Sequence, residues 1–157
     1  MKRLIKILAL IPLFALILLV AVIATRYLNA PAPDPITTAI EQQLEAGKKQ
    51  IALAELTDFE WDTVVILGPY SPAETANKAL GFTWSDYHQF DDALISEVSD
   101  VMVFAKAGKV VKAFVHPRYM GDFTEGALDT ALTPKQAVFE VIPDSKEPDW
   151  KRLQLVK

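Results

Sequence analysis

The sequence has no cysteine, so disulfide bridges, thiolate metal sites and a lipid-modified N-terminal cysteine are excluded. Positive charge is also scarce over most of the chain. Four of the 16 basic residues lie in the first 26 positions, where there is no acidic residue, and the other 131 residues hold 12 basic and all 20 acidic residues, a net charge of −8. A body this acidic is poorly suited to a phosphate backbone, so we expect no nucleic-acid binding.

What the chain does have is a long apolar run near its start. Residues 7–24 contain no charged or polar side chain, and 18 residues of helix span roughly 27 Å, close to the thickness of a bilayer core. With Leu4 and Ile5 the run reaches full length, so the sequence predicts a transmembrane helix over residues 4–24 within an anchor of residues 1–26. The alternative is a signal peptide cleaved after Ala24 or Ala30.

The charges around this run predict an orientation. Lys2, Arg3 and Lys6 precede it and only Arg26 follows closely, which favours a cytoplasmic N-terminus and an exported body. We therefore expect a single-pass protein of the bacterial inner membrane whose domain is periplasmic or extracellular. Residues 27–35 contain three prolines and predict a short extended linker to a domain of residues 36–157.

Within the body, two helices have clear start signals. Asp34 followed by Pro35 is typical of an N-cap and first helical position. Ser71 and Glu74 form a capping-box pattern that predicts a helix over 72–80, ended by Gly81.

The strands are predicted by apolar runs and turn residues. Residues 61–67 are apolar on both faces and predict a central strand. Residues 101–105 and 110–115 flank Gly108 and predict a hairpin, and further strands are expected at 137–142 and, at a sheet edge, 150–156. The fold class expected is α+β: the transmembrane helix, then a compact domain with one mostly antiparallel sheet and two or three helices.

Two histidines are the obvious candidates for chemistry. His88 lies among acidic residues, but a solvated acidic loop is favoured over a metal or acid–base cluster. Near His116, Arg118 is a candidate for gripping an anionic group, and the favoured alternative pairs it with Asp122 to hold a turn. No base–nucleophile pair is recognisable, so we predict no catalytic residue, no metal, no cofactor and no enzyme activity.

Aromatic residues are dense between positions 70 and 90. Core packing is the favoured interpretation of Trp84, Tyr87 and Phe90. If these side chains are partly exposed, they form an aromatic patch rimmed by Asp91 and Asp92, which is the composition of a protein interface. The candidate binding residues are Trp84, Tyr87, Phe90, Asp91, Asp92 and Arg118.

Three blocks of sequence carry a resemblance to known proteins. They are Trp61-Asp62-x-Val64 with Gly68-Pro69-Tyr70, then Leu80-Gly81-Phe82, and then Val103-Phe104, Gly108-Lys109-Val110-Val111, His116-Pro117-Arg118 and Gly121-Asp122-Phe123. In this order the chain resembles small uncharacterised bacterial envelope proteins, either membrane-anchored or lipoproteins. The resemblance implies a location and no activity. The order of elements is also similar to that of small outer-membrane assembly lipoproteins, at the level of fold alone.

The expected function follows from these observations. We expect a membrane-anchored envelope protein that attaches through residues 4–24 and whose acidic domain binds a protein partner, with a basic partner favoured by its charge. An envelope maintenance factor and an immunity protein against an exported toxin both fit. The alternatives are a domain that binds a small ligand or lipid and, less favoured, an envelope hydrolase using His88 or His116.

Overall fold

The computed structural model describes residues 16, 18–21, 32–144, 146–147 and 150–156. The chain divides into two units, Met1–Ala32 and Pro33–Lys157. In the first unit, the described residues 16 and 18–21 are helical. Both candidate cleavage sites, the charges that flank the apolar run and residues 27–31 of the predicted linker lie outside the described residues.

The predicted membrane anchor is not supported by this structure. Crossing a bilayer requires about 20 consecutive apolar residues of helix, and no helix formed by the described residues is long and apolar enough to do so. Of residues 4–24, five are described, and the rest lie outside the described part. The prediction of a single-pass inner-membrane protein with a cytoplasmic N-terminus and an exported domain depended on that helix, and no helix of the described residues supports it.

The second unit contains three α-helices and eight strands among its described residues, with short 3₁₀ turns between them. In chain order the elements are α2 (Pro35–Glu45), β1 (Gln50–Ala52), η1 (Leu53–Glu55), β2 (Thr63–Leu67), α3 (Ala73–Leu80), η2 (Tyr87–Phe90), α4 (Asp91–Leu94), β3 (Ser99–Lys106), β4 (Lys109–Pro117), η3 (Arg118–Met120), β5 (Asp122–Phe123), β6 (Ala131–Leu132), β7 (Val138–Pro143) and β8 (Lys151–Leu155).

The strands form two sheets where the sequence predicted one. The first sheet has the order β4-β3-β2-β6 and is antiparallel throughout, and the second has the order β1-β7-β8-β5, with a parallel pair between β5 and β8. The burial of the strands differs accordingly: β2 and β3 are buried along nearly their whole length, whereas in β7 Phe139 is the buried residue and the others are half-buried or exposed. A partly buried strand such as β7 fits best in an outer sheet that packs on the first sheet.

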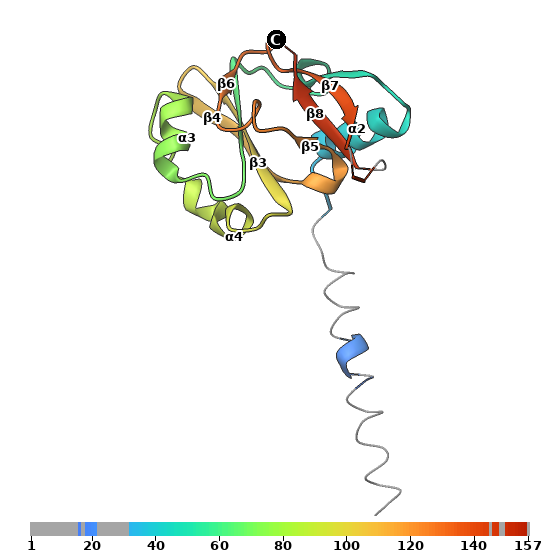
Figure 1. The fold of residues 1–157 in the computed structure, drawn as a ribbon. Coiled ribbons are helices and arrows are strands. Elements are labelled where there is room, and N and C mark those ends of the chain that lie inside the picture. Colours follow the sequence, from blue (N-terminus) through green and yellow to red (C-terminus); the bar gives the residue numbers. More distant parts are fainter. Residues whose placement is uncertain (1–15, 17, 22–31, 145, 148–149, 157) are drawn as a thin grey trace, which may run out of the picture. The chain divides into compact units, whose positions relative to one another are not determined.

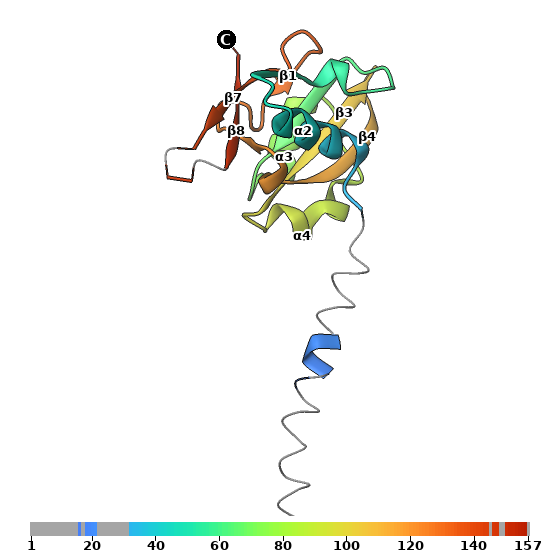
Figure 2. The ribbon, with the colours of Figure 1, turned by 90° about the vertical axis from the view of Figure 1, so that its right-hand side faces the viewer.

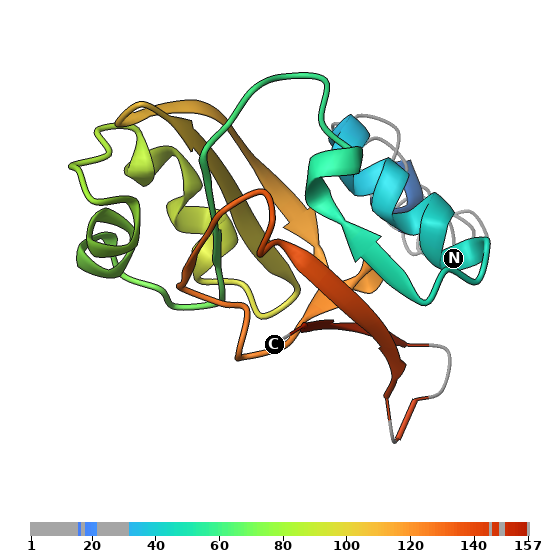
Figure 3. The same cartoon turned by 90° about the horizontal axis from the view of Figure 1, so that it is seen from above.

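The central sheet is therefore buried on both sides. Val65, Val101 and Val103 face a cluster formed with α3 and α4, while Ile66 and Phe104 face the second sheet and α2. Figures 1 and 3 show this layering, with α3 and α4 on one side of β3 and β4, and α2, β7 and β8 on the other.

Helix α2 begins as its sequence predicts. The Asp34 carboxylate accepts a hydrogen bond from the backbone N–H of Ile36 at 3.0 Å, and Pro35 occupies the first helical position. Ile36 and Ile40 are buried against the core, and the Thr37 side chain is fully buried beside β4. In Figure 2 this helix lies in front of the central sheet.

Two local predictions need correction. The capping box at Ser71 does not form, because the Ser71 hydroxyl donates to the Asp129 carboxylate at 2.5 Å and α3 begins after Pro72 with no side-chain cap. Strand β8 is an inner strand, since the two-residue β5 pairs with its outer side. The hairpin of β3 and β4 is confirmed, and Gly108 adopts a φ of +74° in its turn.

Candidate protein-binding surface

The predicted aromatic residues lie mainly inside the domain. Trp84 and Tyr87 are 6% and 7% exposed, and Phe90 is half-buried. The Trp84 ring lies 5.9 Å from Tyr87 and 5.3 Å from Phe90, centre to centre. We call these three residues the helix-layer cluster, because they pack with α3 and α4 against the central sheet. The structure thus favours core packing over an exposed aromatic patch.

The charged candidates are placed differently. Asp91 and Asp92 are exposed at the start of α4. Arg118 donates from Nε to an Asp122 carboxylate oxygen at 2.7 Å and from a terminal nitrogen to the Glu97 carbonyl at 2.6 Å. The hydrogen bond from Arg118 to Asp122 raises the guanidinium pKa further. Arg118 therefore holds a turn, as the favoured interpretation of the sequence has it.

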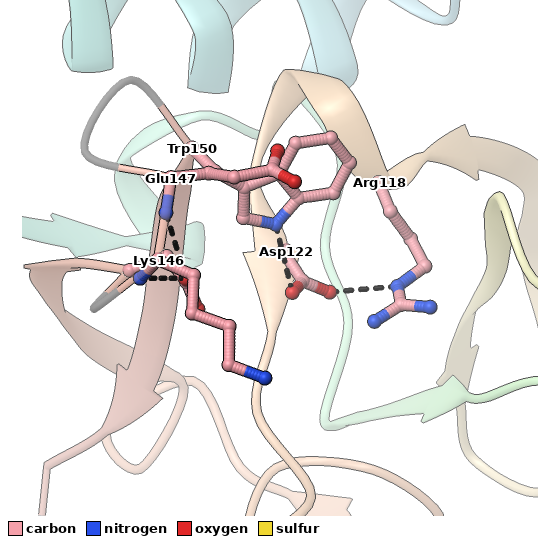
Figure 4. A pocket seen from close by; sticks show the side chains of 6 residues that line it. Arg118, Asp122, Lys146, Glu147 and Trp150 are labelled. Atoms are coloured by element: carbon pink, nitrogen blue, oxygen red, sulfur yellow. Dashed lines mark hydrogen bonds and ion pairs between the residues drawn. The ribbon is translucent and has the colours of Figure 1, made fainter.

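A cavity of about 320 Å³ adjoins this ion pair. Figure 4 shows Asp122 between Arg118 and Trp150, and the Trp150 indole donates to Asp122 at 3.0 Å. Asp144 accepts from the backbone N–H groups of Lys146 and Glu147, and these bonds lower its carboxyl pKa. Because the polar groups of the lining largely bond to one another, we assign this cavity a structural role.

A different part of the domain exposes large apolar side chains. Tyr70 is 64% exposed, and Ile95, Val98 and Tyr119 are each 67% exposed. We call these four residues the end surface. Scattered exposed apolar residues are ordinary, but a group of them on neighbouring segments is typical of a binding site.

Hydrogen bonds bring the four residues together from three segments. The Tyr70 N–H donates to the Leu94 carbonyl at 2.6 Å, and the Tyr70 hydroxyl donates to the Glu97 carboxylate at 3.3 Å. The Arg118 N–H donates to the Val98 carbonyl at 3.0 Å. The loop after β2, the segment between α4 and β3, and the turn η3 are thus joined in that order, and Tyr119 directly follows the residue that is bonded to Val98.

The backbone at Tyr70 is strained. Its φ is +64°, a left-handed conformation that is rare for a bulky residue and costs on the order of 1–3 kcal/mol. The hydrogen bonds of Tyr70 to Leu94 at the end of α4 and to Glu97 in the loop before β3 hold this conformation in place. The result is a tyrosine ring presented to solvent on a fixed backbone.

The surroundings of the end surface are acidic. Asp91, Asp92, Glu97 and Asp129 are all exposed near the segments that form it. Residues 82–105 contain no lysine or arginine, and the Arg118 guanidinium is already paired with Asp122.

Two buried polar residues lie opposite each other beneath the end surface. His116 and Asp100 are cross-strand partners on β4 and β3, at 0% and 1% exposure. His116 donates from Nε2 to the Gly121 carbonyl at 2.7 Å and accepts at Nδ1 from the Thr37 hydroxyl at 3.0 Å. Burial lowers its pKa to about 4, so the ring is neutral near neutral pH.

Asp100 differs from His116, because neither of its carboxylate oxygens has a hydrogen-bond partner among the described residues. Burial raises its pKa to about 7; the charge of Arg118 opposes this shift, and those of Asp122 and Asp129 add to it. Asp100 was not predicted from the sequence, although an aspartate directly before the apolar run of residues 101–105 is a visible signal.

The remaining histidine belongs to the solvated surface. The His88 side chain is 80% exposed, and its Nδ1 lies 3.2 Å from the Asp91 carboxylate. In the described part of the chain, no three acidic or histidine side chains are placed to hold a metal ion. Ile95, Val98 and Tyr119 were also not predicted, because they lie in a loop and a short turn without any periodic pattern.

In comparisons with known proteins, no family model, no curated protein and no solved structure matches this chain.

Proposed function

We propose that the domain acts without catalysis, by binding a protein partner through the end surface. The observation that carries this proposal is the set of four large apolar side chains, each about two-thirds exposed, on three segments joined by hydrogen bonds.

The composition of the end surface supports a protein partner. Two of its four residues are tyrosines, and tyrosine is enriched among the residues that dominate binding energy because it buries a large ring at little cost in side-chain entropy. The hydrogen bonds of Tyr70 and Arg118 hold the surface in one arrangement before binding, which reduces the entropy lost on association.

The charge around the surface specifies the partner further. Exposed carboxylates at Asp91, Asp92, Glu97 and Asp129 lie on or close to the segments that carry the apolar residues. A partner with an apolar centre and a basic rim matches this arrangement, and opposite charges also accelerate association. Binding of this kind serves a maintenance factor and an immunity protein equally well.

The histidines argue against the hydrolase alternative. Both ring nitrogens of His116 are occupied by Thr37 and Gly121, and the ring is fully buried. A general base needs a nitrogen within reach of the substrate proton. His88 is in solvent with Asp91, in a setting that neither orients nor desolvates a substrate.

A random peptide library displayed on phage tests the proposal directly. Peptides selected on the full chain should combine aromatic or aliphatic residues with lysine or arginine. A double variant with Ile95→Ser and Tyr119→Ser should lose at least about tenfold in affinity for these peptides, the effect of losing two anchors of a small interface.

Val111→Ser is the matched control, because Val111 is also an exposed apolar residue, 47% exposed, near the hairpin turn of β4. Its binding should equal that of the original chain. Equal losses in the control and the double variant, or selected peptides that bind both unchanged, would contradict the proposal.

A further inference from the structure

Asp100 is an anomaly that the proposed function does not explain. It is 1% exposed, and both carboxylate oxygens lack a hydrogen-bond partner among the described residues. An ionised carboxylate in such a position costs several kcal/mol, whereas a neutral carboxyl group is tolerated far more easily. The arrangement seen here therefore suits the protonated form.

The charged and titratable groups that act on Asp100 come from three elements and one loop. His116 on β4 lies directly across, neutral and with both nitrogens used. Asp122 on β5 uses its oxygens for Arg118 and Trp150. Asp129, before β6, accepts from Ser71. Among the groups that act on Asp100, Arg118 of η3 is the one with a positive charge.

Arg118 connects Asp100 to the end surface. Its guanidinium donates to the Glu97 carbonyl, and its backbone N–H donates to the Val98 carbonyl. Glu97 in turn accepts from the Tyr70 hydroxyl. A displacement of the Arg118 side chain would therefore remove the bond to Glu97, one of the two Arg118 contacts that hold the loop before β3, which carries Ile95 and Val98.

We propose that Asp100 regulates the end surface by gaining and losing a proton. With a neutral Asp100, Arg118 is available to Glu97 and Asp122, and the surface is held together. An ionised Asp100 draws the guanidinium inward, because a buried carboxylate needs a charged hydrogen-bond donor and no other is at hand among the described residues. The end surface is then ordered at mildly acidic pH and loosened above neutrality.

Both forms of Asp100 are accessible under ordinary conditions. Burial raises its carboxyl pKa to about 7, so a change from pH 6 to pH 8 moves the group from mostly neutral to mostly charged. This regulation rests on the proposed function, since it concerns the same surface.

Hydrogen exchange of the full chain without any partner tests the inference. After correction for intrinsic rates, protection of the Tyr70 and Arg118 amides should fall about tenfold between pH 6 and pH 8. Protection of the Val103 amide, at the centre of β3, should remain. In Asp100→Asn, which keeps the shape and removes the charge, the two end-surface amides should show the same protection at both pH values.

Asp58→Asn is the matched control, because Asp58 is an exposed carboxylate in the loop before β2. It should behave as the original chain. Unchanged protection of Tyr70 and Arg118 in the original chain would overturn the inference, as would an equal fall in Asp100→Asn or a fall shared by Val103.

A second measurement covers the case in which Asp100→Asn does not fold. The Asp100 carboxyl carbon of the original chain, followed by NMR, should titrate together with the Arg118 amide. Separate midpoints would overturn the inference. Because neither experiment needs a partner, a failure here is distinct from a failure of peptide binding.

Discussion

The helix-layer cluster and the end surface are both rich in aromatic side chains, and they differ in what surrounds them. Trp84 packs against two other rings, and the Tyr87 hydroxyl donates to the Ser71 carbonyl at 2.5 Å. Tyr70 and Tyr119 instead present about two-thirds of their surface to solvent. The density of aromatic residues therefore marks the core of this domain, and exposure on joined segments marks the surface that we propose binds a partner.

Removal of a buried tryptophan should separate the two regions most sharply. Trp84→Ala should lower the free energy of unfolding by about 3–5 kcal/mol, because it leaves a cavity between α3, α4 and the central sheet. Tyr119→Ala should change it by less than about 0.5 kcal/mol. Urea denaturation of both variants measures this, and similar losses would show that the two regions do not differ in role.

The pH dependence of stability should reveal opposite effects of Asp100 and His116, the two buried polar residues beneath the end surface. The raised pKa of Asp100 makes stability fall as pH rises from about 4 to about 7, and the lowered pKa of His116 makes stability rise between about 4 and 6.5. In the original chain the two trends largely offset each other. Asp100→Asn should leave the trend of His116, a gain of about 3 kcal/mol from pH 4 to pH 6.5.

Urea midpoints of the original chain and of Asp100→Asn at pH 4.5, 5.5 and 6.5 provide the measurement. A flat profile in the variant, or a steep rise in the original chain, would show that Asp100 does not offset His116.

A smaller effect is expected from the strained tyrosine. Tyr70→Gly removes the left-handed strain and also the hydroxyl bond to Glu97, so unfolding stability should rise by at most about 1 kcal/mol. Binding of the selected peptides should weaken, because an anchor is lost. Thermal unfolding and peptide titration together check this, and a variant that binds as well as the original would remove Tyr70 from the end surface.

The local elements of the domain could be predicted because their signals are short in range. The apolar run of β2, the hairpin around Gly108 and the cap at Asp34 each depend on residues within a few positions of one another. The division into two sheets could not be predicted in this way. It depends on pairs such as Phe139 with Leu155 and on which faces the helices leave uncovered.

The candidate site was less accessible to sequence reasoning. Arg118 and its bond to Asp122 were foreseen from their spacing on a turn. The end surface was not, since it joins residues 70, 95, 98 and 119 through tertiary hydrogen bonds. The failure at Ser71 has the same cause: a distant carboxylate, Asp129, takes the hydroxyl that the local pattern assigned to the helix.

The most direct test of the central claim is site-specific photo-crosslinking in living cells of the source organism. A photoreactive residue at position 119 should capture a single defined protein, one with basic residues beside its apolar contact site, and a residue at position 111 should not. Capture should disappear when Ile95→Ser is added. Equal capture from both positions, or capture at 119 that Ile95→Ser leaves unchanged, would contradict a binding role for the end surface.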